Sequence, residues 1–141
     1  MRVRLLATLL IITAISTSCG TPLPAPIPDA ALTTLKDFMA YRIAGDEDHA
    51  LGFLSPELRQ TIHYQELLPA SSPRWLDYTI ISAQRTANTN VLVTVQISLA
   101  AKPVGEEMLG YVQQSITFEQ RGDKWVVTKI DVEKLVPIPT K

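Results

Sequence analysis

The apolar residues of this chain change their spacing at Arg74, and that change restricts the fold more than any other feature. Before Arg74 they recur at three- and four-residue steps, the period of a helix with one buried face. After Arg74 they alternate with small or polar residues, as in strands with one buried face. The longest alternation contains Val91, Val93, Val95, Ile97 and Leu99. Helices followed by strands predict an α+β domain, with N-terminal helices packed on a curved antiparallel sheet of about four strands.

The first predicted helix covers residues 29–44, because its apolar residues fall on one helix face. These residues are Leu32, Leu35, Met39 and Ile43. Asp29 is expected to be the N-cap, since its carboxylate can accept a hydrogen bond from a free N–H of the first turn. Gly45 is expected to end the helix.

Two shorter helices are predicted after this one. Asp46 is expected to cap a helix over residues 47–54, and Ser55 to cap a helix that begins at Pro56. Residues 63–73 contain prolines and serines and are expected to form an irregular connection.

Four strands are predicted from the twofold alternation, over residues 74–85, 91–99, 112–118 and 125–132. Their connections are expected at residues 87–90, 102–110 and 121–124, where glycine, proline, asparagine and aspartate gather. Connections this short join neighbouring antiparallel strands, so the sheet is expected to be a meander.

Two segments resemble a known superfamily. FMAYRIAGDEDHALGFLSPELR resembles the first two helices of many bacterial nuclear-transport-factor-two-like (NTF2-like) domains, and FEQRGDKWVVTKIDV resembles their closing hairpin. The superfamily fold, shared with ketosteroid isomerases and polyketide cyclases, is cone-shaped. The resemblance implies a pocket between sheet and helices, used for catalysis, ligand binding or protein contacts, and a homodimer through the open sheet face. It implies no single activity, because fold alone does not determine function.

The N-terminus is typical of a secretory signal. Arg2 and Arg4 precede an apolar run over residues 5–15, which is too short to span a bilayer as a helix. Small polar residues follow at 16–18, and then comes Cys19, the only cysteine of the chain. This layout predicts a bacterial lipoprotein signal, cleaved before Cys19, whose thiol then carries lipid such as palmitate. The alternative is an ordinary secreted protein with a free thiol, a rare feature outside the cell.

The expected organisation is therefore a signal peptide at 1–18, a lipidated cysteine and tether at 19–28, an α+β domain at 29–134 and a tail at 135–141. The tether contains four prolines and is expected to be extended, reaching roughly 28 Å at ~3.1 Å per residue. The expected location is the cell membrane, lipid-anchored and extracytoplasmic. Gly20 favours the outer membrane in a Gram-negative host, since aspartate there retains some lipoproteins at the inner membrane.

The charge excludes one class of partner. Cleavage after residue 18 removes Arg2 and Arg4 and leaves 11 basic and 14 acidic residues, a net charge of −3. Nucleic-acid binding selects basic surfaces, so no nucleic-acid partner is expected. Contact with the membrane is expected through the lipid on Cys19.

Reactive constellations are not found in the sequence. His49 and His63 stand fourteen residues apart without ligand spacing around them, so no metal and no cofactor is expected. Isomerase chemistry would need a carboxylate base and hydrogen-bond donors in one apolar pocket. The only candidates are Tyr41, Asp77, Tyr78 and Asp131. Asp77 and Tyr78 are neighbours on a strand and should point to opposite faces, so no catalytic residue is assigned.

Five aromatic residues are the candidate pocket or partner surface: Tyr41, Trp75, Tyr78, Tyr111 and Trp125. The alternative is that they fill the core. The expected function is that of a non-enzymatic binding module for a partner protein or a small apolar ligand. One alternative is an accessory or assembly subunit of an envelope secretion or conjugation system, and another is an isomerase- or cyclase-type enzyme.

Overall fold

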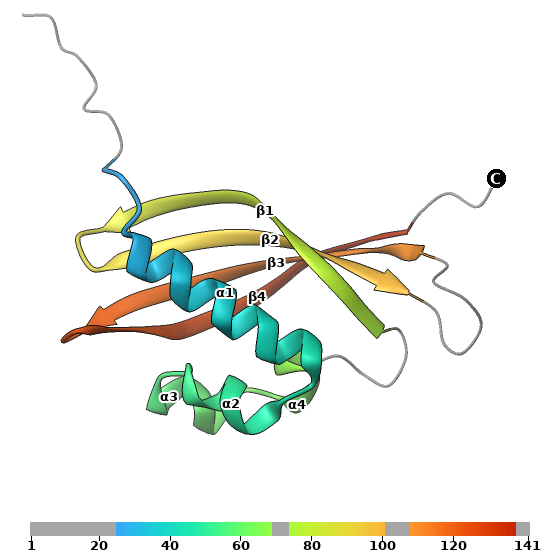
Figure 1. Cartoon of the computed structure of the whole chain (residues 1–141), viewed down its shortest axis with the longest axis horizontal. Coiled ribbons are helices and arrows are strands. Elements are labelled where there is room, and N and C mark those ends of the chain that lie inside the picture. The colour runs from blue at the N-terminus through green and yellow to red at the C-terminus, as the bar shows by residue number, and fades with distance from the viewer. Residues whose placement is uncertain (1–24, 69–73, 101–107, 138–141) are drawn as a thin grey trace, which may run out of the picture.

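Four helices precede four strands in the computed structural model, which describes residues 25–68, 74–100 and 108–137 (Figure 1). The helices are α1 (Asp29–Ala44), α2 (Glu47–Gly52), α3 (Pro56–Thr61) and α4 (Tyr64–Leu67). The strands are β1 (Arg74–Ala87), β2 (Asn90–Ala100), β3 (Met108–Arg121) and β4 (Lys124–Pro137). The predicted signal, Cys19 and most of the tether lie outside the described residues, as do residues 138–141.

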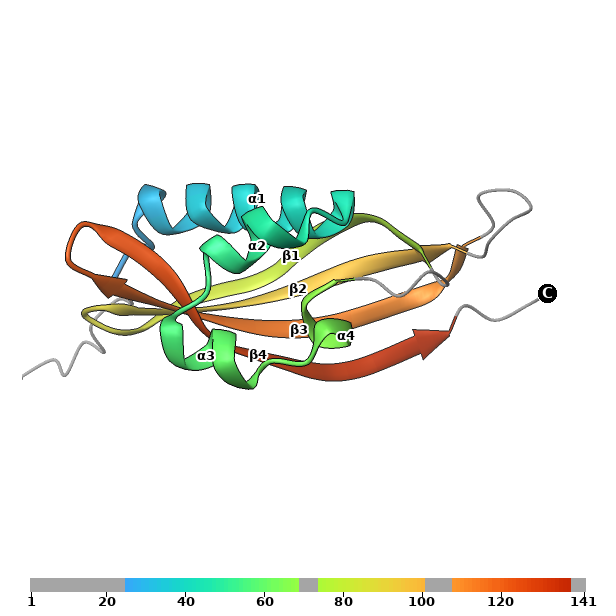
Figure 2. The ribbon, with the colours of Figure 1, turned by 90° about the horizontal axis from the view of Figure 1, so that it is seen from below.

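The strands form one antiparallel sheet in the order β1-β2-β3-β4, so each strand pairs with its neighbour in sequence. Helix α1 lies across one face of this sheet, called here the inner face, with α2 beside it (Figure 2). On β2 the residues of the inner face are buried, as their alternation predicts. The predicted α+β class and the meander are confirmed.

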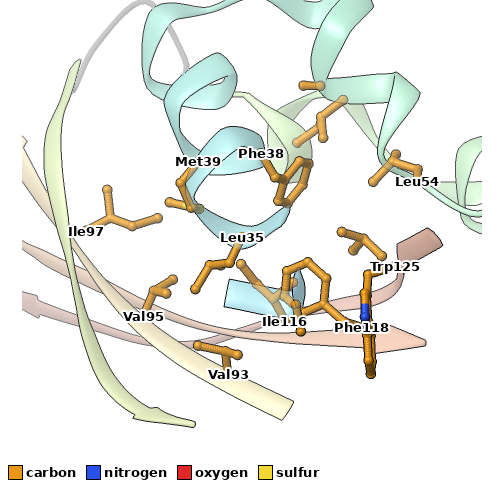
Figure 3. Close-up of a cluster of buried hydrophobic side chains, with 14 of the residues drawn as sticks. Leu35, Phe38, Met39, Leu54, Val93, Val95, Ile97, Ile116, Phe118 and Trp125 are labelled. Carbon is orange, nitrogen blue, oxygen red and sulfur yellow. The ribbon is translucent and has the colours of Figure 1, made fainter. Parts of the chain in front are cut away.

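The core lies between α1 and the inner face of the sheet (Figure 3). Leu35, Phe38 and Met39 are fully buried on α1 and point toward the apolar residues of β2 and β3. Those residues include Val93, Val95, Ile97, Ile116 and Phe118. Burying each such side chain stabilises the fold by about 1.5–3 kcal/mol, which is why α1 holds its position across the strands.

The helix ends follow their predicted residues in three of four cases. Gly45 ends α1 in the left-handed region at φ 74°. Asp46 accepts a hydrogen bond from the backbone N–H of His49 at 3.2 Å, and Ser55 caps α3 in the same way. The prediction for Asp29 is wrong. Pro28 is the N-cap of α1, because its carbonyl accepts the first helical hydrogen bonds, and Asp29 already belongs to the first turn.

Other elements differ from the sequence pattern. Helix α2 ends at Gly52 rather than at Leu54. Helix α4 lies within residues 63–73, where no regular element is predicted. Strand β3 begins at Met108, inside the predicted loop, and β4 continues to Pro137 rather than ending near Val132. The strand ends are set by pairing: Gly110 pairs with Leu99 on one side and with Pro137 on the other.

The segment between α2 and α3 closes part of the β4 edge. The backbone N–H of Ser55 donates to the carbonyl of Val127 at 2.8 Å, and the N–H of Val127 donates to the carbonyl of Phe53 at 2.8 Å. Exposed strand edges invite unwanted pairing, and this short parallel bridge covers β4 there. It also fixes the end of α2 beside the β3–β4 hairpin.

Candidate binding site

A partly open pocket of about 310 Å³ lies between the first turns of α1, the end of α2 and the start of β4. We call it the hairpin pocket. Its lining residues are Ala30, Thr34, Gly52, Phe53, Asp123, Lys124, Trp125 and Val126. Trp125 belongs to the inner face and is only 7% exposed, whereas Asp123 and Lys124 are exposed at the rim. The pocket thus combines an aromatic lining with a charged rim.

Local structure keeps the hairpin pocket in shape. The ring of Phe53 packs against Phe38 and Tyr41, at centroid distances of 5.8 and 5.9 Å. The β3–β4 turn is closed by Gly122, whose φ of 66° is costly for other residues. Gly52 leaves room at the end of α2, since a Cβ built there meets no atom within 4 Å. A larger residue at position 52 would extend into this space without forcing the backbone.

A second polar feature lies deep in the domain, at Arg42 on α1. Its side chain is fully buried. Nε donates to the carbonyl of Leu67 at 2.6 Å, and Nη2 donates to the carbonyl of Glu66 at 2.8 Å and to Oε1 of Gln114 at 2.9 Å. The guanidinium thereby joins α1, α4 and β3.

Burial lowers the pKa of Arg42 to about 9, so the group remains charged at neutral pH. Two aromatic rings lie beside this charge: the Cζ atom is 5.1 Å from the ring centre of Phe38 and 4.8 Å from that of Trp75. Such contacts are attractive and compensate part of the lost hydration. Each acceptor on the guanidinium is neutral.

No family model and no curated protein matches the sequence. The fold is that of NTF2-like proteins.

A crystal structure of an NTF2-like protein of unknown function from Shewanella oneidensis matches 74% of this chain and 96% of its own, with a TM-score of 0.52 and 16% identity. The solution structure of a SEC-C motif-containing protein from Rhodopseudomonas palustris matches 75% of this chain and 91% of its own, with a TM-score of 0.54 and 12% identity. At these identities the likeness concerns the fold, and the site must be judged from its own residues.

Within the NTF2-like fold, the five predicted aromatic residues lie in different places. Trp125 lines the hairpin pocket, and Tyr41 packs behind Phe53. Trp75 lies against the buried Arg42. Tyr78 is half-buried on β1, where burial and the Asp37 carboxylate raise the pKa of its hydroxyl.

Tyr111 pairs with Ser98 on the outer face of the sheet, away from the helices. The five aromatic residues therefore do not share one surface. Two of them, Tyr41 and Trp125, belong to the region of the hairpin pocket.

The acid–base candidates are also separated. Asp77 is exposed at the edge strand β1, and Tyr41 lies on α1. Asp131 pairs with Ser115 on the outer face, because an irregularity beside Phe118 shifts the register of β4 after Val127. Trp125 stays on the inner face, so the bulge places the two residues on opposite faces.

Both histidines are exposed. Nδ1 of His49 lies 2.8 Å from Oδ2 of Asp46, and its ring stacks on Tyr41 at 4.7 Å. Hydrogen bonding by His49 lowers the pKa of Asp46. Over the described ranges, no group of three His, Cys, Asp or Glu residues is arranged to hold a metal ion. Among the helices of those ranges, none is long and apolar enough to cross a membrane.

Sequence reasoning did not single out Arg42, Gln114 or Phe53. The signal for Arg42 was its spacing: it follows Phe38 by four residues and Met39 by three, so it lies on the apolar face of α1. Gln114 likewise stands between Val112 and Ile116 in the alternation of β3. A charged residue in an apolar stripe, and an amide in an apolar alternation, are informative because such groups are seldom buried without a partner.

Proposed function

We propose that this chain is an extracytoplasmic lipoprotein, anchored by lipid on Cys19, whose NTF2-like domain binds a partner protein at the hairpin pocket. The observation that carries the proposal is the pocket itself. It has aromatic residues in its lining and charged residues at its rim, between segments fixed by the hydrogen bonds of Val127. The lipid anchor is supported by the layout of the first twenty residues.

The size of the hairpin pocket favours a protein partner over a small apolar ligand. Pockets that enclose whole ligands are typically about 300–1,000 Å³ and cover most of the ligand surface. A partly open pocket of about 310 Å³ lies at the lower end of that range. It suits one aromatic or branched side chain of a partner, with Asp123 and Lys124 placed for polar contacts around it.

The separation of the acid–base candidates supports binding rather than catalysis. An isomerase-type mechanism needs a base and hydrogen-bond donors around one reacting atom. Tyr41, Asp77 and Asp131 lie on α1, the exposed side of β1 and the outer face of β4, respectively. None of the three lines the hairpin pocket.

The position of α1 supports a membrane-associated partner. Ala30 and Thr34 of the pocket belong to the first turns of α1, which begins ten residues after Cys19. An extended tether over residues 20–28 spans roughly 28 Å at ~3.1 Å per residue. The hairpin pocket would therefore lie within reach of envelope proteins near the bilayer surface.

Site-specific photo-crosslinking in the full lipoprotein tests this proposal. A benzoylphenylalanine placed at Lys124 should crosslink to one membrane protein, whereas the same group at Arg74, an exposed residue at the start of β1, should not. Adding Gly52→Leu should abolish the Lys124 crosslink, because Gly52 is one of the lining residues and the space around it is open, so a leucine there would obstruct the pocket. A crosslink that survives Gly52→Leu, or one to a second copy of the chain alone, would contradict the proposal.

A further inference from the structure

Among the residues that the structure describes, no opposite charge pairs with the buried Arg42. The ion pairs within the described residues involve His49, Arg121 and Lys129 as the cations. Moving a charge from water into the protein interior is unfavourable, and hydrogen bonds to neutral acceptors offset only part of that loss. Replacing buried charged groups with apolar side chains of similar volume often leaves the stability of a protein unchanged or increases it. Stability alone therefore does not explain why a guanidinium occupies this position.

The hydrogen bonds of Arg42 leave one of its N–H groups without an acceptor among the described residues. A guanidinium has five N–H groups. Nε donates once and Nη2 donates twice, while the single partner of Nη1 is Sδ of Met39 at 3.4 Å. Thioether sulfur is a weak acceptor. Nη1 therefore lacks a strong hydrogen-bond acceptor, and it lies beside Nη2, which donates to Gln114.

Gln114 connects this charge to a part of the inner face that the helices leave uncovered. Ile80, Val95, Gln114 and Val132 form one row across the four strands. Val95 and Gln114 are buried in the middle of the row, but its ends are open: Ile80 is 38% exposed and Val132 is 55% exposed. Paired residues on neighbouring strands lie only about 5 Å apart. A molecule lying on Val132 is therefore one side chain away from Arg42.

We propose that Arg42 binds the carboxylate of an apolar organic acid, which replaces the amide oxygen of Gln114 on the guanidinium. The amide oxygen is a neutral substitute for one carboxylate oxygen, and the second carboxylate oxygen would accept from Nη1. The acid would enter from the side of Val132, the exposed residue paired with Gln114, by displacing the Gln114 side chain. The hydrocarbon part of the ligand then lies along the exposed apolar end of the row.

The surroundings select this class of ligand. Guanidinium and carboxylate match in shape and charge, and their paired hydrogen bonds are about twice as strong as neutral ones. Phe38, Trp75 and Met39 surround the charge with apolar and aromatic groups. An apolar acid satisfies both parts of the site, whereas a hydrated anion such as sulfate would lose its water among aromatic rings.

The probe for the first experiment is 3-phenylpropanoate, with 3-phenylpropanamide as the uncharged control of the same shape. Thermal unfolding of the domain is followed with increasing concentrations of each. When the concentration of unbound 3-phenylpropanoate is about five times its Kd, Tm should rise by about 4–8 °C, since a ligand that binds only the folded state stabilises it. The amide should have little effect. Equal stabilisation by both compounds would overturn the proposal.

Two variants of Gln114 separate ligand binding from a purely structural role of Arg42. Gln114→Ala removes the internal acceptor, so the domain should melt at a lower temperature and the acid should raise its Tm more than that of the wild type. Gln114→Glu supplies an internal carboxylate, so Tm should rise and the acid should have no further effect. If the Gln114→Ala variant gains nothing from the acid, or the Gln114→Glu variant responds as fully as the wild type, Arg42 is structural only.

The charge itself is tested with Arg42→Met, which keeps an apolar side chain in place of the guanidinium. This variant should lose the response to the acid. If it does not fold, the two Gln114 variants still decide the question. The experiment is independent of the hairpin pocket, because Gly52→Leu should leave the acid response unchanged.

Discussion

The hairpin pocket and the surroundings of Arg42 differ in where their apolar groups and their charges lie. At the pocket, apolar surface is left open and the charges of Asp123 and Lys124 lie in water. Around Arg42, the apolar side chains are packed and the charge is inside. A domain built for stability alone would avoid both arrangements, since each gives up hydrophobic or hydration free energy. We propose that the two regions are separate sites on one scaffold, one for a partner's side chain and one for an acid.

The largest effect should come from Arg42→Ala. This change removes the donor from the buried carbonyl of Leu67, the partly buried carbonyl of Glu66 and the buried amide of Gln114, and it opens a cavity. A loss of about 3–5 kcal/mol in the free energy of unfolding is expected, measured by urea denaturation. Lys36→Ala, at an exposed position of the same helix, is the matched control and should change stability little. A loss below about 1 kcal/mol for Arg42→Ala would mean that α4 is held by other contacts.

The parts of the molecule that the sequence predicted are those that depend on residues close together in the chain. The bounds of α1 and the caps at Asp46 and Ser55 depend on residues close together in the chain, and local patterns identified them. Helix α4 depends on hydrogen bonds from Arg42, more than twenty residues earlier, so its four residues carry little local signal. The hairpin pocket brings together three segments, among them α1 and β4, that only the folded chain makes neighbours.

An intermediate effect is expected for Ser55→Ala. Ser55 is buried, and its hydroxyl accepts from the N–H of Leu58 at the start of α3. Losing a helix N-cap typically costs about 1 kcal/mol. Because the backbone of Ser55 pairs with Val127, the change should also loosen that edge of the pocket. Urea denaturation gives the stability, and hydrogen exchange at the Val127 amide shows whether the loosening reaches β4. An unchanged exchange rate at Val127 would confine the effect to α3.

A smaller effect is expected at the exposed cap of α2, and it should depend on pH. The contacts with His49 lower the pKa of Asp46 from its ordinary value of 3.8. A carboxyl whose pKa is lower in the folded state stabilises that state above its unfolded pKa. This stabilisation is lost as the pH falls through the folded value. The difference in urea midpoint between wild type and Asp46→Asn should therefore shrink between pH 6 and pH 3. A difference that stays constant over this range would show that the charge of Asp46 contributes nothing to the cap.

The smallest effect on stability, and the sharpest test of the two-site comparison, is expected for Gly52→Leu. Gly52 is the last residue of α2, lines the pocket and has open space around its missing side chain, so a leucine there should obstruct the pocket without meeting the backbone. Stability should change by no more than about 0.5 kcal/mol, since the better helix propensity of leucine offsets its partial exposure. Yet the variant should lose its partner crosslink, while its melting temperature should still respond to 3-phenylpropanoate. If filling the pocket also suppressed that response, the two regions would be one coupled site, because a pocket change would then reach Arg42 through α1.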